Sequence, residues 1–458
     1  MSRIIHPSAI AVTIAVTTAI VGSLSSGQAS AAGFALTENS ASGMGNAFAG
    51  ASATASDAST VYFNPAGMTH LKQRQISGAL HLIRTRAQYV DQGSTAAGGA
   101  LLSGSNENIQ ADALVPNFYY VVPMEDRWTF GLGVNVPFGL KTDYEDDWVG
   151  RYHAVKSQIE SININPSFAY QVDEKLSLGF GLSAQYVDVT LTNVVDFGSI
   201  CEDLEGSTIP AGTCASLGAS PQGNDGFADL QADSLSWGYN FGLLYDITPR
   251  SRAGIAYRSR VAHTLEGDAD FTVPGNLAFL TGSGNFIDTD LSSNADLPES
   301  FSFSLYHEYS EKLAVMFDWT LTRWRRFDEL RIDYDSVQPD SVTTEKWNDS
   351  DRYSLGFNYQ YSETLMLRGG VALDETSIPD RTHRTPRIPG NDRRWVSVGF
   401  GYKINEALSV DVGYSHLFLN DTKINHTYES GVSTINHTLK GKYESSVDIF
   451  STQLNMKF

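Results

Sequence analysis

Apolar and polar residues alternate along most of the chain from residue 73 onward. In the stretch YSLGFNYQY, Tyr353, Leu355 and Phe357 share one face, while Ser354 and Gly356 share the other. The stretches LSLGFGLSA and WVSVGFGYKI have the same period of two. This alternation predicts strands with one apolar and one polar face.

Segments of this kind follow one another to the end of the chain, and we count fourteen strands. After every odd strand comes a long connection, and after every even strand a tight one such as PMED, ITP or YS. This bias is typical of an up-and-down barrel that crosses the outer membrane, with both chain ends on the periplasmic side. The expected strands are 73–90, 109–122, 127–137, 154–171, 174–194, 229–246, 250–274, 292–309, 311–335, 341–360, 363–376, 391–403, 406–421 and 443–458.

The expected fold is therefore all-β, a fourteen-stranded antiparallel transmembrane barrel over residues 73–458. Its last strand alternates up to a terminal aromatic residue, Phe458, as outer-membrane barrels commonly do. Many of the strands exceed the nine to eleven residues that a bilayer requires, so we expect the barrel to project above the membrane.

A leader precedes the barrel. It has one early cation, Arg3, an apolar run SAIAVTIAVTTAIVG and the small-residue site Ala29-Ser30-Ala31. These features predict a signal peptide over residues 1–31 and an exported protein, since the run is short for a membrane span.

Composition narrows the function classes. The net charge of -20 argues against nucleic-acid binding, which needs a basic stripe. Acidic stretches such as TDYEDDW indicate solvated loops, and no spacing specifies a metal site. We expect no cofactor. The two cysteines, Cys201 and Cys214, fall in one loop of an exported chain, which predicts a disulfide, the alternative being two free thiols.

Residues 32–72 are rich in small side chains and precede the first strand. A barrel of fourteen strands has a lumen too wide for its own side chains, so we expect this segment, with short helices, to plug it. In the motif Asn64-Pro65-Ala66, the amide of Asn64 can bond its own backbone before a turn, and Pro65 moves Asn64 away from helical conformation.

This segment, AGFALTENSASGMGNAFAGASATASDASTVYFNPAGM, resembles the hatch of the FadL family, the outer-membrane transporters of long-chain fatty acids and hydrocarbons. The resemblance continues through most of the chain in the order PFGL, WVGRYHAVKS, INPSFAY, LPESFSFSLY, DWTLTRW, LRGGVALDET, IPGNDRRW and SVDVGYSH.

The resemblance implies a route for the ligand. The ligand is caught in an apolar groove between outer loops, enters a lumen pocket lined by the mature N-terminus, and leaves sideways where the third strand kinks inward. It places Phe34 in that pocket. In the third strand, RWTFGLGVNVPFGL, we expect the lateral gate at Gly131, Gly133 and Pro137, because these residues weaken a strand ladder.

One outer loop, FTVPGNLAFLTGSGNFI at 271–287, is unusually apolar. Leu277, Phe279, Leu280 and Phe286 are expected to line the capture groove, opposite the loop with the two cysteines. The alternative is that they pack on the barrel rim.

The family uses basic side chains near the ligand carboxylate, and here the match fails in part, since the strand 174–194 contains no Arg. By alternation Arg258, Arg260, Arg352 and Arg368 belong to inward sets and are the expected substitutes. The alternative for each is a salt bridge within the lumen.

The expected function is passive uptake of long-chain fatty acids, with aromatic or alkane hydrocarbons as the alternative ligands, by a monomer surrounded by outer-membrane lipid and lipopolysaccharide. A general porin would lack the plug. An enzyme is not expected, because the chain has no Gly-x-Ser-x-Gly elbow and its histidines have no paired nucleophile. An adhesin or phage receptor remains compatible with the long loops.

Overall fold

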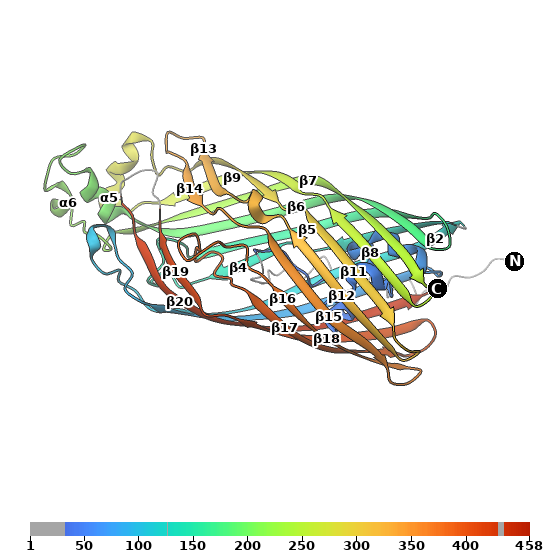
Figure 1. The fold of residues 1–458 in the computed structure, drawn as a ribbon. Coiled ribbons are helices and arrows are strands. Elements are labelled where there is room, and N and C mark those ends of the chain that lie inside the picture. The colour runs from blue at the N-terminus through green and yellow to red at the C-terminus, as the bar shows by residue number, and fades with distance from the viewer. Residues whose placement is uncertain (1–32, 126, 429–434) are drawn as a thin grey trace, which may run out of the picture.

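The computed structural model describes residues 33–125, 127–428 and 435–458, so the predicted signal peptide at 1–31 lies outside the described residues. The described part is a closed antiparallel barrel with short helices (Figure 1). Its strand stretches are β1 (Gln75–Asp91), β2 (Asn108–Glu125), β3 (Trp128–Asn135), β4 (Gly139–Asp143), β5 (Lys156–Gln171), β6 (Leu176–Asp196), β7 (Asp225–Thr248), β8 (Ser251–Arg258), β9 (Val261–Thr272), β10 (Thr289–Leu297), β11 (Ser300–Glu308), β12 (Leu313–Thr322), β13 (Glu329–Tyr334), β14 (Ser341–Thr344), β15 (Ser350–Gln360), β16 (Leu365–Asp374), β17 (Arg393–Lys403), β18 (Leu408–Leu419), β19 (Thr422–Thr427) and β20 (Thr438–Lys457).

Six pairs of these stretches continue one another as single, interrupted strands of the wall: β3 and β4, β8 and β9, β10 and β11, β12 and β13, β14 and β15, and β18 and β19. The wall thus has the fourteen strands that the alternation predicts, and the expected fold is confirmed. The barrel closes where β1 pairs antiparallel with β20 along its whole length.

The two ends of the barrel differ. Tight turns gather at the end where the C-terminus lies, and the long connections with their helices extend beyond the other end (Figure 1). The wall alternates as expected, because Leu355 and Phe357 are exposed on the outside while Ser354 is buried on the inside. This outward apolar surface suits contact with lipid.

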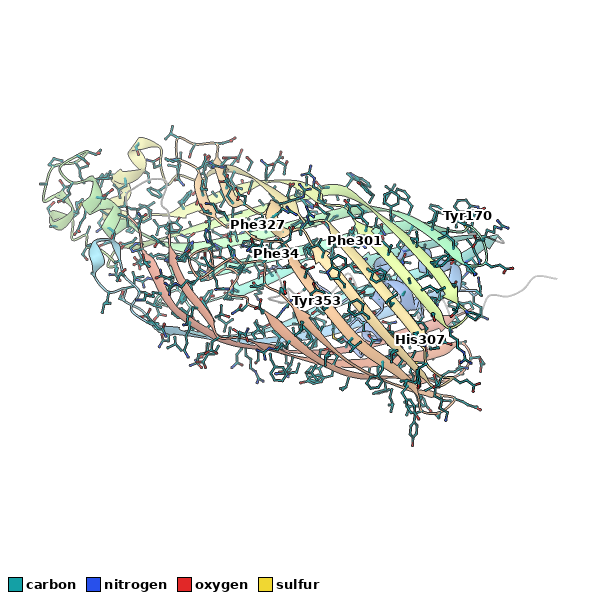
Figure 2. The ribbon with its side chains drawn as sticks, in the orientation of Figure 1. Phe34, Tyr170, Phe301, His307, Phe327 and Tyr353 are labelled. Carbon is teal, nitrogen blue, oxygen red and sulfur yellow. A yellow bond between two sulfur atoms is a disulfide. The ribbon has the colours of Figure 1, made fainter. Side chains whose placement is uncertain are left out.

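The N-terminal segment, residues 33–72, lies inside the barrel, with its helices at the tight-turn end (Figure 1) and Phe34 farther from that end (Figure 2). It forms α2 (Ala41–Met44), α3 (Ala51–Thr54), α4 (Thr60–Phe63) and the 3-10 helix η1 (Pro65–His70). These elements contact opposite walls, since α2 packs on β17 and β18, α3 on β8 and β11, and η1 on β5, β6 and β7.

Asn64 ties this segment together and to the wall. Its Oδ1 accepts from the N–H of Ala66, while its amide donates to the carbonyls of Ser52 at 2.7 Å and Leu243 at 3.0 Å. The side chain is fully buried. Asn64 therefore begins η1 and also fixes its position against β7.

Wall glycines allow this close approach. A Cβ added to Gly242 would lie 1.9 Å from Oδ1 of Asn64, and one added to Gly179 would lie 2.3 Å from the backbone nitrogen of Ala66. Only a residue without a side chain lets the backbone of η1 rest on β6 and β7 in this way.

The long connections carry four further helices, and Cys201 and Cys214 form a disulfide between two of them. These helices are η2 (Ala97–Gly99), α5 (Phe197–Leu204), α6 (Thr213–Ser216) and η3 (Gly275–Ser283), and η4 (Trp324–Arg326) lies between β12 and β13. Among the residues that the structure describes, no helix is both long and apolar enough to cross a membrane.

We predict that Gly242→Val displaces the N-terminal segment, because the new side chain would occupy the space of Asn64. The barrel should still form, since Val suits a strand, but limited proteolysis should cleave residues 33–72 in the purified variant. The matched control is Gly78→Val on β1, where an added Cβ meets nothing within 4 Å. Equal protease resistance of both variants would contradict this role of Gly242.

Candidate ligand-binding site

A pocket lies in the lumen between the N-terminal segment and one side of the wall. The segment contributes apolar side chains, among them Leu36, Phe48 and Phe63. The wall contributes a mixed surface of rings, hydroxyls and charges from β7, β8, β11, β12, β15, β16 and β17: Asn240, Phe241, Ala256, Tyr257, Arg258, Ser300, Ser302, Asp318, Thr320, Thr322, Ser350, Arg352, Asp374 and Arg393. The lumen pocket therefore combines apolar surface with hydroxyl and charged groups.

Arg352 is the best placed cation. It is 7% exposed, its Nη1 donates to Oγ of Ser354 at 2.6 Å, and its Nη2 donates to the carbonyl of Ala47 at 3.0 Å. Its Nε is buried and has no partner among the described residues. The guanidinium also lies over the ring of Trp395, 4.9 Å from its centroid. Arg352 thus keeps one buried donor without a partner among the described residues, and an unmet buried donor costs free energy.

A second buried cation, Arg393, pairs with Asp374 in the same pocket. Neither Arg393 nor Asp374 was predicted from the sequence as part of the site. The alternation along β17 places Arg393 and Trp395 on its inward face, where both are buried, whereas Arg394 is exposed. This alternation could have indicated Arg393. Arg352 and Arg393 both line this pocket, so one anionic group of a ligand can face both arginines.

Arg258 also lines the lumen pocket. Its Nη2 donates to the carbonyl of Tyr62 at 3.0 Å, and its guanidinium lies 4.4 Å from the centroid of the Tyr62 ring. It therefore links β8 to the N-terminal segment and presents positive charge at the far side of the pocket from Arg352.

The inward assignment of Arg260 is wrong. Arg260 is exposed on the outside and pairs with Asp296 at 2.8 Å. The cause is an extra residue at Ser259, where β8 ends and β9 has not begun, so the alternation changes phase between Arg258 and Val261.

Arg368 faces inward as expected but does not line the lumen pocket. It forms a buried ion pair with Asp411 at 2.6 Å, beneath α2. Arg368 therefore follows the alternative expectation, a salt bridge within the lumen.

The third strand of the wall is interrupted after Asn135. The ladder between β2 and β3 ends at the pair Phe118 and Val134, and β4 then pairs with β5 alone in the described residues. Residues 136–138 form the break, with Pro137 at its centre. Gly131 and Gly133 lie within the regular ladder instead, where a Cβ on Gly131 would meet Met68 of the N-terminal segment.

The start of the N-terminal segment closes over this break. The N–H of Leu36 donates to the carbonyl of Pro137 at 2.8 Å, and the N–H of Gly139 donates to the carbonyl of Phe34 at 2.9 Å. Residues 34–36 thus form a short added strand on the interrupted edge, and they supply partners that β2 does not.

Phe34 anchors this added strand. It is 4% exposed and lies among four aromatic rings, with centroid distances of 4.9 Å to Trp324, 6.0 Å to Phe138, and 6.1 Å to both Phe327 and Trp347. Figure 2 shows Phe34 close to Phe327 within the barrel. Its neighbours Ala35 and Leu36 line the lumen pocket, and the Phe34 ring packs beside it.

A buried carboxyl supports the aromatic cage of Phe34. Nε1 of Trp347 donates to Oε2 of Glu345 at 2.8 Å, and both residues are buried. Burial raises the pKa of Glu345 to about 8, against the opposing effects of the Trp347 hydrogen bond and of Arg387.

A second pocket is lined by the loop-side ends of several wall strands and by residues of the long connections. Its apolar side includes Ile200, Leu230, Phe271 and Phe286, and its polar side includes His153, His426, His437 and Arg387. Nδ1 of His153 lies 3.1 Å from Nδ1 of His426. Arg387 donates to Oγ of Ser157 at 2.9 Å. We call this cavity the outer pocket.

Of the four apolar loop residues predicted to line a groove, only Phe286 lines the outer pocket within the described residues. Leu277 and Leu280 are buried beside the disulfide, in one cluster with Phe197, Cys201 and Cys214. Phe279 is 43% exposed. The two leucines therefore follow the alternative of packing within the rim.

A closed barrel with an apolar outer surface, an N-terminal segment in its lumen and two pockets that combine apolar and polar side chains is the architecture of an outer-membrane channel for hydrophobic compounds. A family model described as outer membrane protein transport protein (OMPP1/FadL/TodX) matches residues 22–458. The chain belongs to this family. It is a multi-pass barrel of the outer membrane, and it is a transport channel and not an enzyme.

Relatives and solved structures agree with this assignment. The chain is 31% identical to the long-chain fatty acid transport protein of Escherichia coli, over 96% of this chain and 97% of that protein, and 30% identical to outer membrane protein P1 of Haemophilus influenzae, over 95% and 97%. The crystal structure of a Pseudomonas aeruginosa FadL homologue superposes with a TM-score of 0.83 at 23% identity, covering 93% of this chain and 99% of that chain. The Pseudomonas putida toluene transporter TodX superposes with a TM-score of 0.66 at 18% identity, covering 93% and 99%.

We predict that Glu345 makes the barrel less stable at alkaline pH. The folded protein keeps the Glu345 proton up to about pH 8, while the unfolded chain loses it near 4.5, so stability falls as the pH rises between these values. The side chain introduced by Glu345→Gln is neutral at every pH, so stability of this variant should not show this part of the decrease. The measurement is the thermal midpoint of purified protein at pH 6 and pH 9, with exposed Glu363→Gln as the control. Equal pH slopes for wild type and Glu345→Gln would refute the assignment.

Proposed function

We propose that this channel takes up long-chain fatty acids passively, through the outer pocket and the lumen pocket, and releases them sideways at the break in the third strand. One observation carries the choice of ligand. The lumen pocket joins an apolar surface to a buried guanidinium, Arg352, which has a donor without a partner. A carboxylate beside this guanidinium would be held by its positive charge and by a charge-assisted hydrogen bond.

The apolar side of the pocket suits the acyl chain. Leu36, Phe48 and Phe63 of the N-terminal segment face the pocket together with Phe138 of the wall. Each methylene that leaves water for such a surface contributes about 0.8 kcal/mol. An acyl chain in this place would be held mainly by hydrophobic burial, while Arg352 would orient its head.

The outer pocket fits the first step of uptake. Its apolar loop residues can receive an acyl chain, and its polar side, which carries Arg387 and three histidines, can face a carboxylate. Two sites that both combine apolar and basic surface let one amphipathic ligand move from the outside to the lumen without losing either kind of contact.

The exit is proposed at residues 136–138. Here the wall strand is interrupted. Side chains of Asn117 and Ser161 bond some backbone groups of the break, and residues 34–36, which belong to a short segment and not to the barrel, bond Pro137 and Gly139. Displacement of residues 34–36 would open a gap between β2 and β4 toward the bilayer. An acyl chain that leaves through this gap stays in apolar surroundings.

We predict that Arg352→Gln weakens oleate binding at least about ten-fold, because a hydrogen bond to a charged group is lost from a buried site. Binding of an uncharged hydrocarbon such as toluene should not change. The measurement is quenching of tryptophan fluorescence in purified, folded protein. Arg260→Gln, which changes an exposed arginine outside the pocket, is the matched control.

The outcomes separate the two ligand classes. Oleate binding that survives Arg352→Gln unchanged would remove Arg352 as the anchor. Wild-type protein that binds toluene and not oleate would make this a hydrocarbon channel, the alternative that the toluene transporter's similar fold favours.

We predict that a disulfide between residues 35 and 138 blocks uptake. Ala35 and Phe138 form an antiparallel bridge without direct mutual hydrogen bonds, and such pairs lie about 4.5 Å apart at Cα, within the range of a disulfide. The variant Ala35→Cys with Phe138→Cys should bind labelled oleate when oxidised but not deliver it to the cell, and reduction should restore delivery.

Two controls accompany this experiment. Wild-type protein treated with the same reductant accounts for the Cys201–Cys214 disulfide. Phe138→Cys alone accounts for the lost ring. Full uptake by the oxidised double variant would show that release does not need residues 34–36 to leave the break.

A further inference from the structure

Three hydroxyl groups form a row across the wall of the lumen pocket. Ser300 on β11 pairs in register with Thr322 on β12, and Thr322 pairs in turn with Ser350 on β15. All three line the pocket, and Ser350 is only 3% exposed. Their side-chain oxygens form no hydrogen bond with another of the described residues, and they are open to the pocket.

The next row toward the tight-turn end is different. Ser302 and Thr320 lie 2.8 Å apart, and the hydroxyl of Thr320 donates to Asp318 at 2.9 Å. Ser304 also donates to Asp318. These hydroxyls are already satisfied within the wall. The hydroxyls of Ser300, Thr322 and Ser350 therefore differ from those of the next row, which have hydrogen-bond partners within the wall.

The row lies between two arginines. Ser300 pairs in register with Arg258, and Arg352 is two residues from Ser350 on the same strand and face. Neighbouring strands are spaced about 4.8 Å apart, so the row from β11 to β15 spans about 10 Å. A ligand whose carboxylate is held by Arg352 would pass these hydroxyls with the first half of its carbon chain.

A plain acyl chain would leave such hydroxyls without partners. Polar groups that a bound ligand covers but cannot pair reduce affinity, whereas a ligand that pairs them is favoured. A single hydroxyl on the ligand can both donate to one member of the row and accept from another. The row therefore matches a second polar group on the ligand, distinct from its carboxylate.

We propose that the preferred ligands are long-chain carboxylic acids with a hydroxyl between the carboxyl end and the middle of the chain, held by Thr322 and Ser350. This inference rests on the proposed function, since it places the carboxylate at Arg352. It adds a specificity determinant on β12 and β15 that contacts the carbon chain of the ligand and not its carboxylate.

The test compares 10-hydroxystearate with stearate, which differ only by the hydroxyl. Wild-type protein should bind 10-hydroxystearate about five-fold more tightly, the effect of one net hydrogen bond of about 1 kcal/mol. Thr322→Val combined with Ser350→Ala should bring the ratio to one, because stearate then covers no unpaired hydroxyl and 10-hydroxystearate gains no partner. Ser409→Ala, an inward hydroxyl of β18 away from the pocket, is the matched control and should keep the ratio.

Each result has a defined meaning. Equal affinity of wild type for the two acids, as expected if water alone satisfies the row, would overturn the inference. A preference that persists in the double variant would also overturn it, because the hydroxyl would be read elsewhere. Failure of wild type to bind either acid would instead refute the proposed function, and the inference would fall with it.

Discussion

Backbone groups at the depth of a bilayer need hydrogen-bond partners within the protein, and the whole architecture depends on this constraint. The closed ladder from β1 to β20 meets it over most of the wall. At residues 136–138 the strand ladder is broken, and the side chains of Asn117 and Ser161 supply partners together with residues 34–36. The N-terminal segment is therefore part of the hydrogen bonding of the barrel as well as the filling of its lumen.

This arrangement explains why charge and apolar surface can coexist in the lumen. The N-terminal segment presents apolar side chains to the pocket, while the wall behind it holds its charges in pairs such as Arg368 with Asp411. Buried pairs of this kind contribute little net stability, but a charge left alone in the same place would be costly. Arg352 keeps a free donor because its other nitrogens are bonded to Ser354 and Ala47, which hold it in position.

Most of the fold was predictable from the sequence, because a period of two with tight and long connections determines strand number and orientation. The site was predictable only where the alternation is unbroken. Arg352 was found for this reason, whereas Arg260 was misplaced because the extra residue at Ser259 leaves no mark in the pattern. The cage around Phe34 could not be predicted, since its partners Trp324 and Trp347 come from distant parts of the chain. The unpaired hydroxyl row depends on register between strands, which alternation alone does not set.

The contacts between η1 and the glycines of β6 and β7 constrain the order in which the protein is assembled. Asn64 and Ala66 lie so close to Gly242 and Gly179 that the segment fills its space without clearance, and α2 does the same against the opposite wall. A segment held on both sides in this way is easier to place before the barrel closes than after. The seam between β1 and β20 is therefore expected to close after residues 33–72 have folded against the growing wall, which makes the C-terminal strand the last piece of the chain to take its place.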